Sequence, residues 1–174
     1  LLRNDLGETY TILNNLAKKG YTPTNIGQIT MFFDSKGIYL EDYLDYIPAY
    51  AFSKVEHFPS RWQQNGWLVI PPKIKELKFR CFAGCYNRSL QKVIMTGVET
   101  IEQDVFINCD ELKEVFLGEH LHTLDYACFF NCDSMETIYV PNESVGKLVL
   151  KERREIFLPD STKIINYNTQ EEYK

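Results

Sequence analysis

The chain has 174 residues, of which 44% are hydrophobic and 25% charged, so its size and composition fit one globular domain. Its formal net charge of −5 argues against nucleic-acid binding, which requires clustered lysine and arginine. No apolar run approaches the ~20 residues that a membrane-spanning helix needs. We therefore expect a single domain that neither binds nucleic acid nor inserts into a membrane.

The first expected element is a helix over residues 6–19. Asp5 and Glu8 have the spacing of a capping box at its start, and Gly20 stands where the helix would end. We interpret residues 1–28 as an N-terminal helical cap over the apolar end of the structure that follows. The alternative is that this helix ends a domain lying upstream.

A short phrase, x-Phe-x-x-Cys, then recurs at 81–85, 105–109 and 128–132, with a weaker copy at 51–55 that lacks the cysteine. The phenylalanines of the three strong copies lie 24 and 23 residues apart. A period of this length is typical of solenoid proteins, in which stacked repeats share one continuous core.

Apolar residues recur around the phrase in the same order. Every copy has aliphatic residues five and eight positions before its phenylalanine, and a strand-like apolar run follows. The runs are 68–70, 93–95, 115–117, 138–140 and 156–158. Proline follows three of these five runs, and proline ends a strand because it lacks an amide proton. We therefore expect one short strand in each repeat.

Two segments interrupt this order. An insertion near residues 56–65 follows the first repeat, and a charged segment at 146–154 interrupts the last one. We place the repeats within residues 29–165, and we expect the polar residues 166–174 to form a flexible tail.

The spacing of these apolar positions resembles the BspA-like leucine-rich repeat family of bacterial surface antigens, although Thr96 and Gly118 replace its strand-ending proline. The resemblance covers residues 29–165 and is strongest over 68–140. It implies a right-handed, curved leucine-rich repeat solenoid with a parallel sheet of short strands on the concave face. It also implies protein binding, as in a bacterial surface adhesin, because this family serves mainly as a binding scaffold.

The chain has five cysteines, an odd number that does not suit a disulfide framework. Two C-x3-C pairs, Cys81/Cys85 and Cys128/Cys132, suggest zinc ligation. However, the repeats place Cys85, Cys109 and Cys132 at equivalent positions, with neighbours about 4.8 Å apart. Cys85 and Cys132 are then two repeats apart, too far from each other to bind the same zinc ion. We expect a ladder of buried, reduced thiols. A zinc site and a single disulfide between adjacent repeats are the alternatives.

One residue of each expected strand lies between two core positions and should point outward, because side chains alternate along a strand. These residues are Val69, Ile94, Phe116, Tyr139 and Phe157. All five are apolar or aromatic, which indicates a partner-binding stripe on the concave face. The alternatives are that they only support one another across the strands, or that the terminal segments cover them.

The inserted segment is a second candidate binding site. It contains Phe58, Arg61 and Trp62, and tryptophan and arginine are frequent anchors at protein interfaces. The alternative interpretation is that its aromatic rings pack beneath the loop as a satellite core.

No catalytic constellation is evident. The cysteines occupy repeat core positions, where burial suppresses thiolate chemistry. His120 and His122 flank a core leucine without a third metal ligand at suitable spacing, and His57 stands alone in the insertion. We expect a protein that is not an enzyme and has no cofactor or metal.

We therefore expect a non-catalytic protein-binding module. The alternatives are a structural spacer or stalk within a larger surface protein, and an intracellular inhibitor or adaptor. Homo-oligomerisation through the stripe is a further option. The family resemblance favours the cell surface, whereas unpaired cysteines fit the cytoplasm at least as well, so the compartment stays open.

Overall fold

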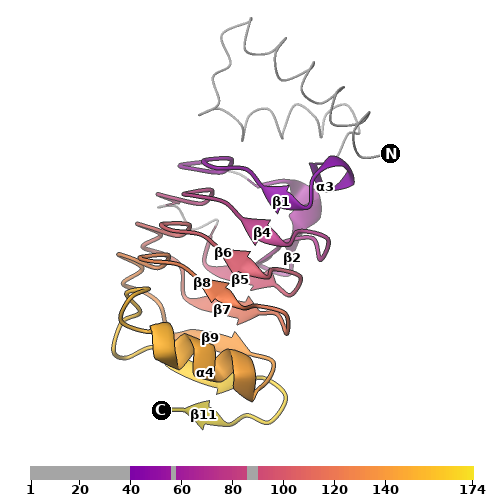
Figure 1. Ribbon diagram of the computed structural model, residues 1–174. Helices are drawn as coiled ribbons and strands as arrows, with labels where there is room; N and C mark the ends of the chain where they lie inside the picture. Colours follow the sequence, from indigo (N-terminus) through magenta and orange to yellow (C-terminus); the bar gives the residue numbers. More distant parts are fainter. Residues whose placement is uncertain (1–39, 56–57, 86–89) are drawn as a thin grey trace, which may run out of the picture.

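The computed structural model describes residues 40–55, 58–85 and 90–174 (Figure 1). Successive repeats add one short strand each to two sheets. Within these residues, the first sheet has four parallel strands, β1 (Tyr46–Ile47), β4 (Glu76–Leu77), β6 (Thr100–Ile101) and β8 (Thr123–Leu124). The expected cap over residues 1–28, and the start of the repeats at 29–39, lie outside the described residues.

The second sheet has seven strands and contains the strand-like runs of the sequence. Its parallel strands are β3 (Trp67–Val69), β5 (Lys92–Met95), β7 (Glu114–Leu117), β9 (Thr137–Val140) and β10 (Lys163–Asn166). Antiparallel strands β2 (Gln63–Gln64) and β11 (Glu172–Tyr173) form its two edges. The strands predicted near 68–70, 93–95, 115–117 and 138–140 are therefore present as β3, β5, β7 and β9.

The fifth predicted strand, at 156–158, is wrong. These residues form the end of a turn that follows helix α4 (Glu143–Glu152). The Ile156 amide donates to the carbonyl of Glu152 at 3.0 Å, and the Leu158 amide donates to that of Arg153 at 3.1 Å. These bonds bend the chain back at the helix end, so the strand that pairs with β9 forms only later, as β10.

The phenylalanines of the repeated phrase form a ladder in the core. Phe52, Phe82, Phe106 and Phe129 are buried, and their ring centroids lie 5.4, 5.3 and 5.5 Å apart along the stack. Adjacent rings are inclined by only 11, 6 and 2°. Each ring therefore fills the space beside the equivalent ring of the next repeat, which explains why the repeats share this residue.

The turn around each ladder phenylalanine joins one repeat to the next. Around Phe106, two residues have left-handed backbone, Asp104 with φ 58° and Asn108 with φ 59°. Alternate amides then point along the stack: Phe106 donates to Cys128 O and Asn108 to Phe130 O, both at 2.8 Å. The other turns have positive φ at the same positions, which are Tyr50, Lys54, Arg80, Gly84, Ala127 and Asn131. The repeated x-Phe-x-x-Cys sequence therefore forms a turn that contacts the equivalent turn of the next repeat through both its backbone amides and its phenylalanine ring.

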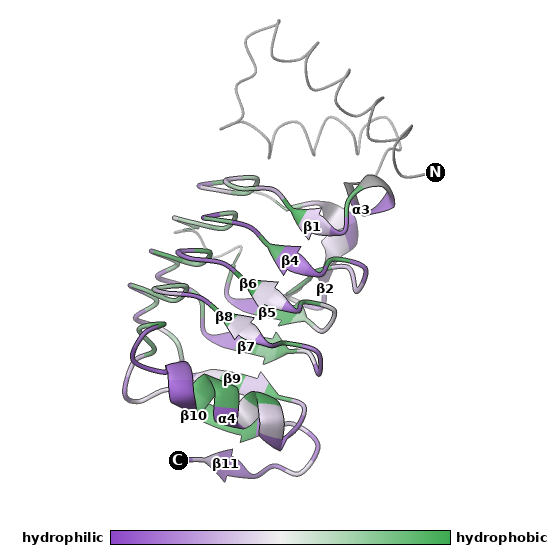
Figure 2. Ribbon diagram, viewed as in Figure 1, coloured by the Kyte–Doolittle hydropathy of each residue, from purple (hydrophilic) through white to green (hydrophobic). Residues whose placement is uncertain are grey.

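Helix α4 packs at the C-terminal end of the stack, against strands of both sheets (Figures 1 and 2). The side chain of Asn142 accepts a hydrogen bond from the Val145 amide at 3.0 Å and so caps the helix start. Val145 and Val149 are buried, whereas Glu143 and Lys147 are exposed. The charged segment that interrupts the last repeat is therefore an amphipathic helix that covers apolar ends of strands.

The last residues were expected to form a flexible tail, but in the structure they complete the seven-stranded sheet. Strand β11 pairs with β10, and Tyr173 packs against the core. A Cβ atom at Gly146 of α4 would lie 2.8 Å from the Tyr173 ring, so the ring approaches the helix where a side chain is missing.

Candidate protein-interaction surface

Four of the five predicted outward residues form one row across the seven-stranded sheet. The register pairs Val69 with Ile94, Ile94 with Phe116, and Phe116 with Tyr139. All four side chains are partly exposed, while their neighbours along each strand are buried. Ile165 of β10 pairs with Tyr139 and extends the row. These five residues are called the outward row below.

Phe157 does not belong to the outward row. It lies in the turn after α4 with φ 60°, and Ile165 occupies the register position that the sequence had assigned to it. Phe157 was assigned to this row because a fifth strand was predicted at 156–158. The strand that pairs with β9 is β10 instead, so the outward position belongs to a residue of β10.

Aromatic rings gather around Phe116. The Tyr139 ring stacks on it at 4.3 Å, the Tyr167 ring stacks at 5.4 Å, and the Trp67 ring meets it edge-on at 5.2 Å. Trp67 was not among the predicted residues, although it precedes Val69 by two residues and therefore shares its face. Tyr167 was not among them either, because it follows β10, a strand that the repeat pattern did not predict. Two rings that the repeat pattern alone does not indicate therefore lie beside the outward row.

Polar groups border these rings. Lys92 Nζ lies 3.0 Å from Glu114 Oε2 and 5.1 Å from the centre of the Trp67 ring. The Tyr139 hydroxyl donates to Glu114 Oε1 at 3.2 Å. Burial, with the nearby Glu114 carboxylate, raises the pKa of Tyr139, so its phenol stays protonated at neutral pH. The surface thus combines large apolar contacts with a fixed polar border.

The inserted loop packs onto the core instead of presenting its aromatic rings. Phe58 and Trp62 are only 3% and 1% exposed, and both rings contact Phe52, at 5.7 and 5.3 Å. Trp62 and Arg61 lie in the short 3₁₀ helix η2 (Ser60–Trp62). This placement agrees with the satellite-core alternative, so we remove Phe58 and Trp62 from the candidate surface.

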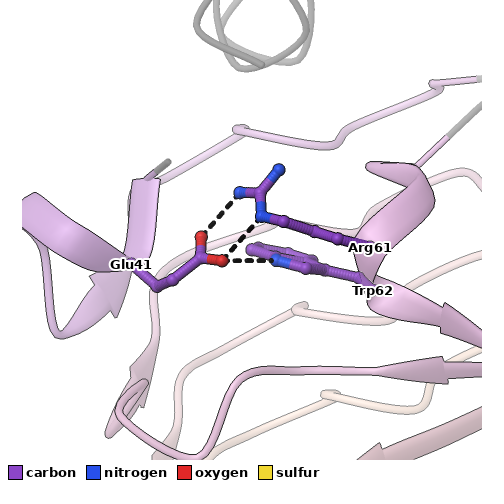
Figure 3. A network of polar contacts seen from close by, with 3 residues as sticks. All are labelled: Glu41, Arg61 and Trp62. Carbon is purple, nitrogen blue, oxygen red and sulfur yellow. Dashed lines mark hydrogen bonds and ion pairs between the residues drawn. The ribbon is translucent and has the colours of Figure 1, made fainter. Parts of the chain in front are cut away.

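A polar clamp holds this loop (Figure 3). Arg61 donates from Nε and Nη2 to the two carboxylate oxygens of Glu41 at 2.7 and 2.6 Å, and Trp62 Nε1 donates to the same carboxylate at 3.3 Å. Glu41 belongs to helix α3 (Leu40–Tyr43). Burial would raise the pKa of Glu41, but the hydrogen bonds from Arg61 and Trp62 outweigh it and leave the pKa lowered. Arg61 therefore serves here as a structural residue.

The five cysteines are buried and free. Three of them donate from Sγ to a ladder phenylalanine carbonyl one repeat earlier: Cys85 to Phe52 O at 3.4 Å, Cys109 to Phe82 O at 3.1 Å, and Cys132 to Phe106 O at 3.0 Å. Burial raises the pKa of Cys132 to about 12, and burial likewise raises that of Cys81, Cys109 and Cys128. The thiols of Cys109 and Cys132 therefore stay protonated at neutral pH and donate hydrogen bonds between repeats.

The histidines were not expected to form a catalytic or metal site. His120 and His122 are exposed, the former 3.3 Å from Glu119 and the latter hydrogen-bonded to Thr123. No group of three potential metal ligands occurs within the described residues. His57 lies outside them.

Comparison with known families identifies the repeat. The family described as BspA type leucine rich repeat region matches residues 31–151 in six copies. The chain belongs to this family. The family favours a repeat solenoid, and the described residues contain parallel strands of successive repeats in two sheets. Neither a curated protein nor a solved structure matches the chain.

Membership in this leucine-rich repeat family favours a protein-interaction module that is not catalytic. Among the described residues, no helix is both long and apolar enough to cross a membrane.

Proposed function

We propose that this leucine-rich repeat protein is a non-catalytic module that binds a protein partner through the outward row of its seven-stranded sheet. The main support for this proposal is the register of the parallel strands. Val69, Ile94, Phe116, Tyr139 and Ile165 lie side by side on five strands, and every one of these side chains is partly exposed and apolar or aromatic.

The chemistry of this face favours a protein partner. Contiguous exposed apolar surface is typical of interaction sites, and aromatic residues supply much of the binding energy at protein interfaces. Trp67 and Tyr167 enlarge the apolar area beside Phe116, and the Lys92–Glu114 pair gives it a polar rim. We infer that this sheet lies on the concave side of a right-handed, curved solenoid. A role as a bacterial surface adhesin is the setting that the family favours.

The direct test is affinity capture with a charge-matched control. Phe116→Glu/Tyr139→Glu places two carboxylates within the outward row. Thr100→Glu/Thr123→Glu adds the same charge at partly exposed positions of the four-stranded sheet. We expect wild type and the threonine variant to capture the same partner, and the outward-row variant to lose it by at least about tenfold. Thermal melts establish that all three proteins are folded.

Equal capture by the two double variants would place the binding site elsewhere on the chain. The absence of any partner from cell lysates and cell surfaces would favour the structural spacer, which has no use for an exposed aromatic row.

A further inference from the structure

The last of the five parallel strands in the seven-stranded sheet differs from the other four at one core position. The register aligns Asn166, at the end of β10, with Val140 at the end of β9. Continued along the sheet, it aligns both with Leu117, Met95 and Ile70. The four apolar side chains are at most 1% exposed, and Asn166 is 5% exposed. A buried amide is unfavourable unless hydrogen bonds satisfy it, so this asparagine needs an explanation of its own.

The Asn166 side chain holds the turn that follows β10. Its Oδ1 accepts from the amides of Asn168 and Thr169 at 2.9 and 3.2 Å, and its Nδ2 donates to the hydroxyl of the tyrosine in β11 at 3.1 Å. The Asn168 side chain donates to Pro141 O at 2.8 Å, which ties the turn to the end of β9. Tyr167 lies between the two asparagines, so its backbone is held on both sides.

The Tyr167 ring lies back over the sheet. The Tyr167 amide donates to Val140 O at 3.0 Å, and the ring stacks on that of Phe116 in β7 at 5.4 Å, with the two planes inclined by 27°. Because β9 lies between β10 and β7, the ring extends across one strand to reach Phe116. The turn needs no aromatic residue here, since Tyr167 contributes its backbone groups to the hydrogen bonds. The ring is partly exposed, so a partner can contact it.

We propose that the turn at residues 166–171 is part of the partner-binding site, in which Tyr167 contacts the partner and Asn166 is the positioning residue that holds it there. This role rests on the function proposed for the outward row, and it adds a residue from beyond 151, where the match to the family ends. A ring already held on Phe116 loses little conformational freedom when a partner binds, which strengthens binding.

Positioning is tested in the free protein by NMR. Stacking on Phe116 should shift the Tyr167 ring protons upfield. Asn166→Val should fold, because valine suits the core position and the freed amides belong to exposed residues that water can reach. In this variant the Tyr167 shifts should move toward random-coil values. Thr162→Val removes another buried hydrogen bond near the C-terminus, from Oγ1 to Met135 O at 2.9 Å, and should leave those shifts unchanged. Unchanged Tyr167 shifts in folded Asn166→Val would overturn the positioning role.

Contact is tested with a defined probe, a peptide selected by phage display for binding to wild type and against binding to Phe116→Glu/Tyr139→Glu. We expect Tyr167→Ala to weaken binding of this peptide by about tenfold, and Tyr167→Phe, which keeps the ring, to stay within about twofold of wild type. Asn166→Val should weaken binding severalfold, and Thr162→Val should not.

The outcomes separate this inference from the function on which it rests. Full affinity of the folded Tyr167→Ala variant would overturn the inference and leave the outward row as a binding surface. Failure to select any peptide that distinguishes wild type from Phe116→Glu/Tyr139→Glu would contradict both.

Discussion

Phe106 and Phe116 stand ten residues apart in one repeat, yet Phe106 lies in the core and Phe116 on the surface of the seven-stranded sheet. Phe106 is fully buried between two parallel rings, whereas Phe116 is partly exposed in the outward row. The inward ladder is phenylalanine in all four described repeats, because each ring must fill the same space. The outward row varies among valine, isoleucine, phenylalanine and tyrosine. Stacking fixes the residue type at the buried turn position and leaves it free at the outward strand position, where binding can select it.

The largest expected effect tests the inward ladder. Phe106→Ala removes a ring from the middle of the stack and should lower the free energy of unfolding by about 3–5 kcal/mol. Phe130→Ala, on an exposed ring of the following repeat, should lower it by less than about 1 kcal/mol. Urea unfolding of both variants checks the contrast. Similar losses would mean that the ladder does not dominate stability.

An intermediate effect on stability tests whether the polar clamp that holds the inserted loop on the core stabilises the fold. Glu41→Gln breaks the charge-assisted bonds to Arg61 and should destabilise the protein by about 1–2 kcal/mol at pH 7. The lowered pKa of Glu41 means that its carboxylate stabilises the fold above the ordinary glutamate pKa of 4.5. That stabilisation is lost as pH falls through the lowered pKa of the folded state. Melting curves of wild type and variant should therefore converge in acid. A difference that persists unchanged near pH 2–3 would exclude this linkage.

The third test concerns the outward row, where the expected effect on stability is small. Phe116→Ala removes ring contacts at a partly exposed position and should cost only about 1 kcal/mol. The variant should nevertheless lose most of the partner capture. A loss of stability as large as that of Phe106→Ala would show that the outward rings are a second structural ladder.

Repetition explains which parts of the fold were predictable. The strands β3, β5, β7 and β9, and the outward positions Val69 through Tyr139, follow from a spacing that recurs with each repeat. Where the repeat is interrupted, the prediction failed. Helix α4 delays the last strand, so Ile165 and not Phe157 completes the row.

Burial of the inserted loop was open in the sequence for a different reason. Phe58 and Trp62 are an equally plausible anchor pair or core pair by residue type, and only the position of Phe52 beneath them decides. The Glu41–Arg61 clamp spans an insertion without a repeat counterpart, so no spacing rule indicates it.

The central claim is that a partner contacts the outward row, and site-specific photo-crosslinking tests it most directly. Ile94→p-benzoylphenylalanine places the photoreactive group in the outward row, and Thr100→p-benzoylphenylalanine places it at a similarly exposed position six residues on, in the four-stranded sheet. With the captured partner present, we predict a crosslink from position 94 and little or none from position 100. A crosslink from position 100 alone, or equal yields from both positions, would contradict the account.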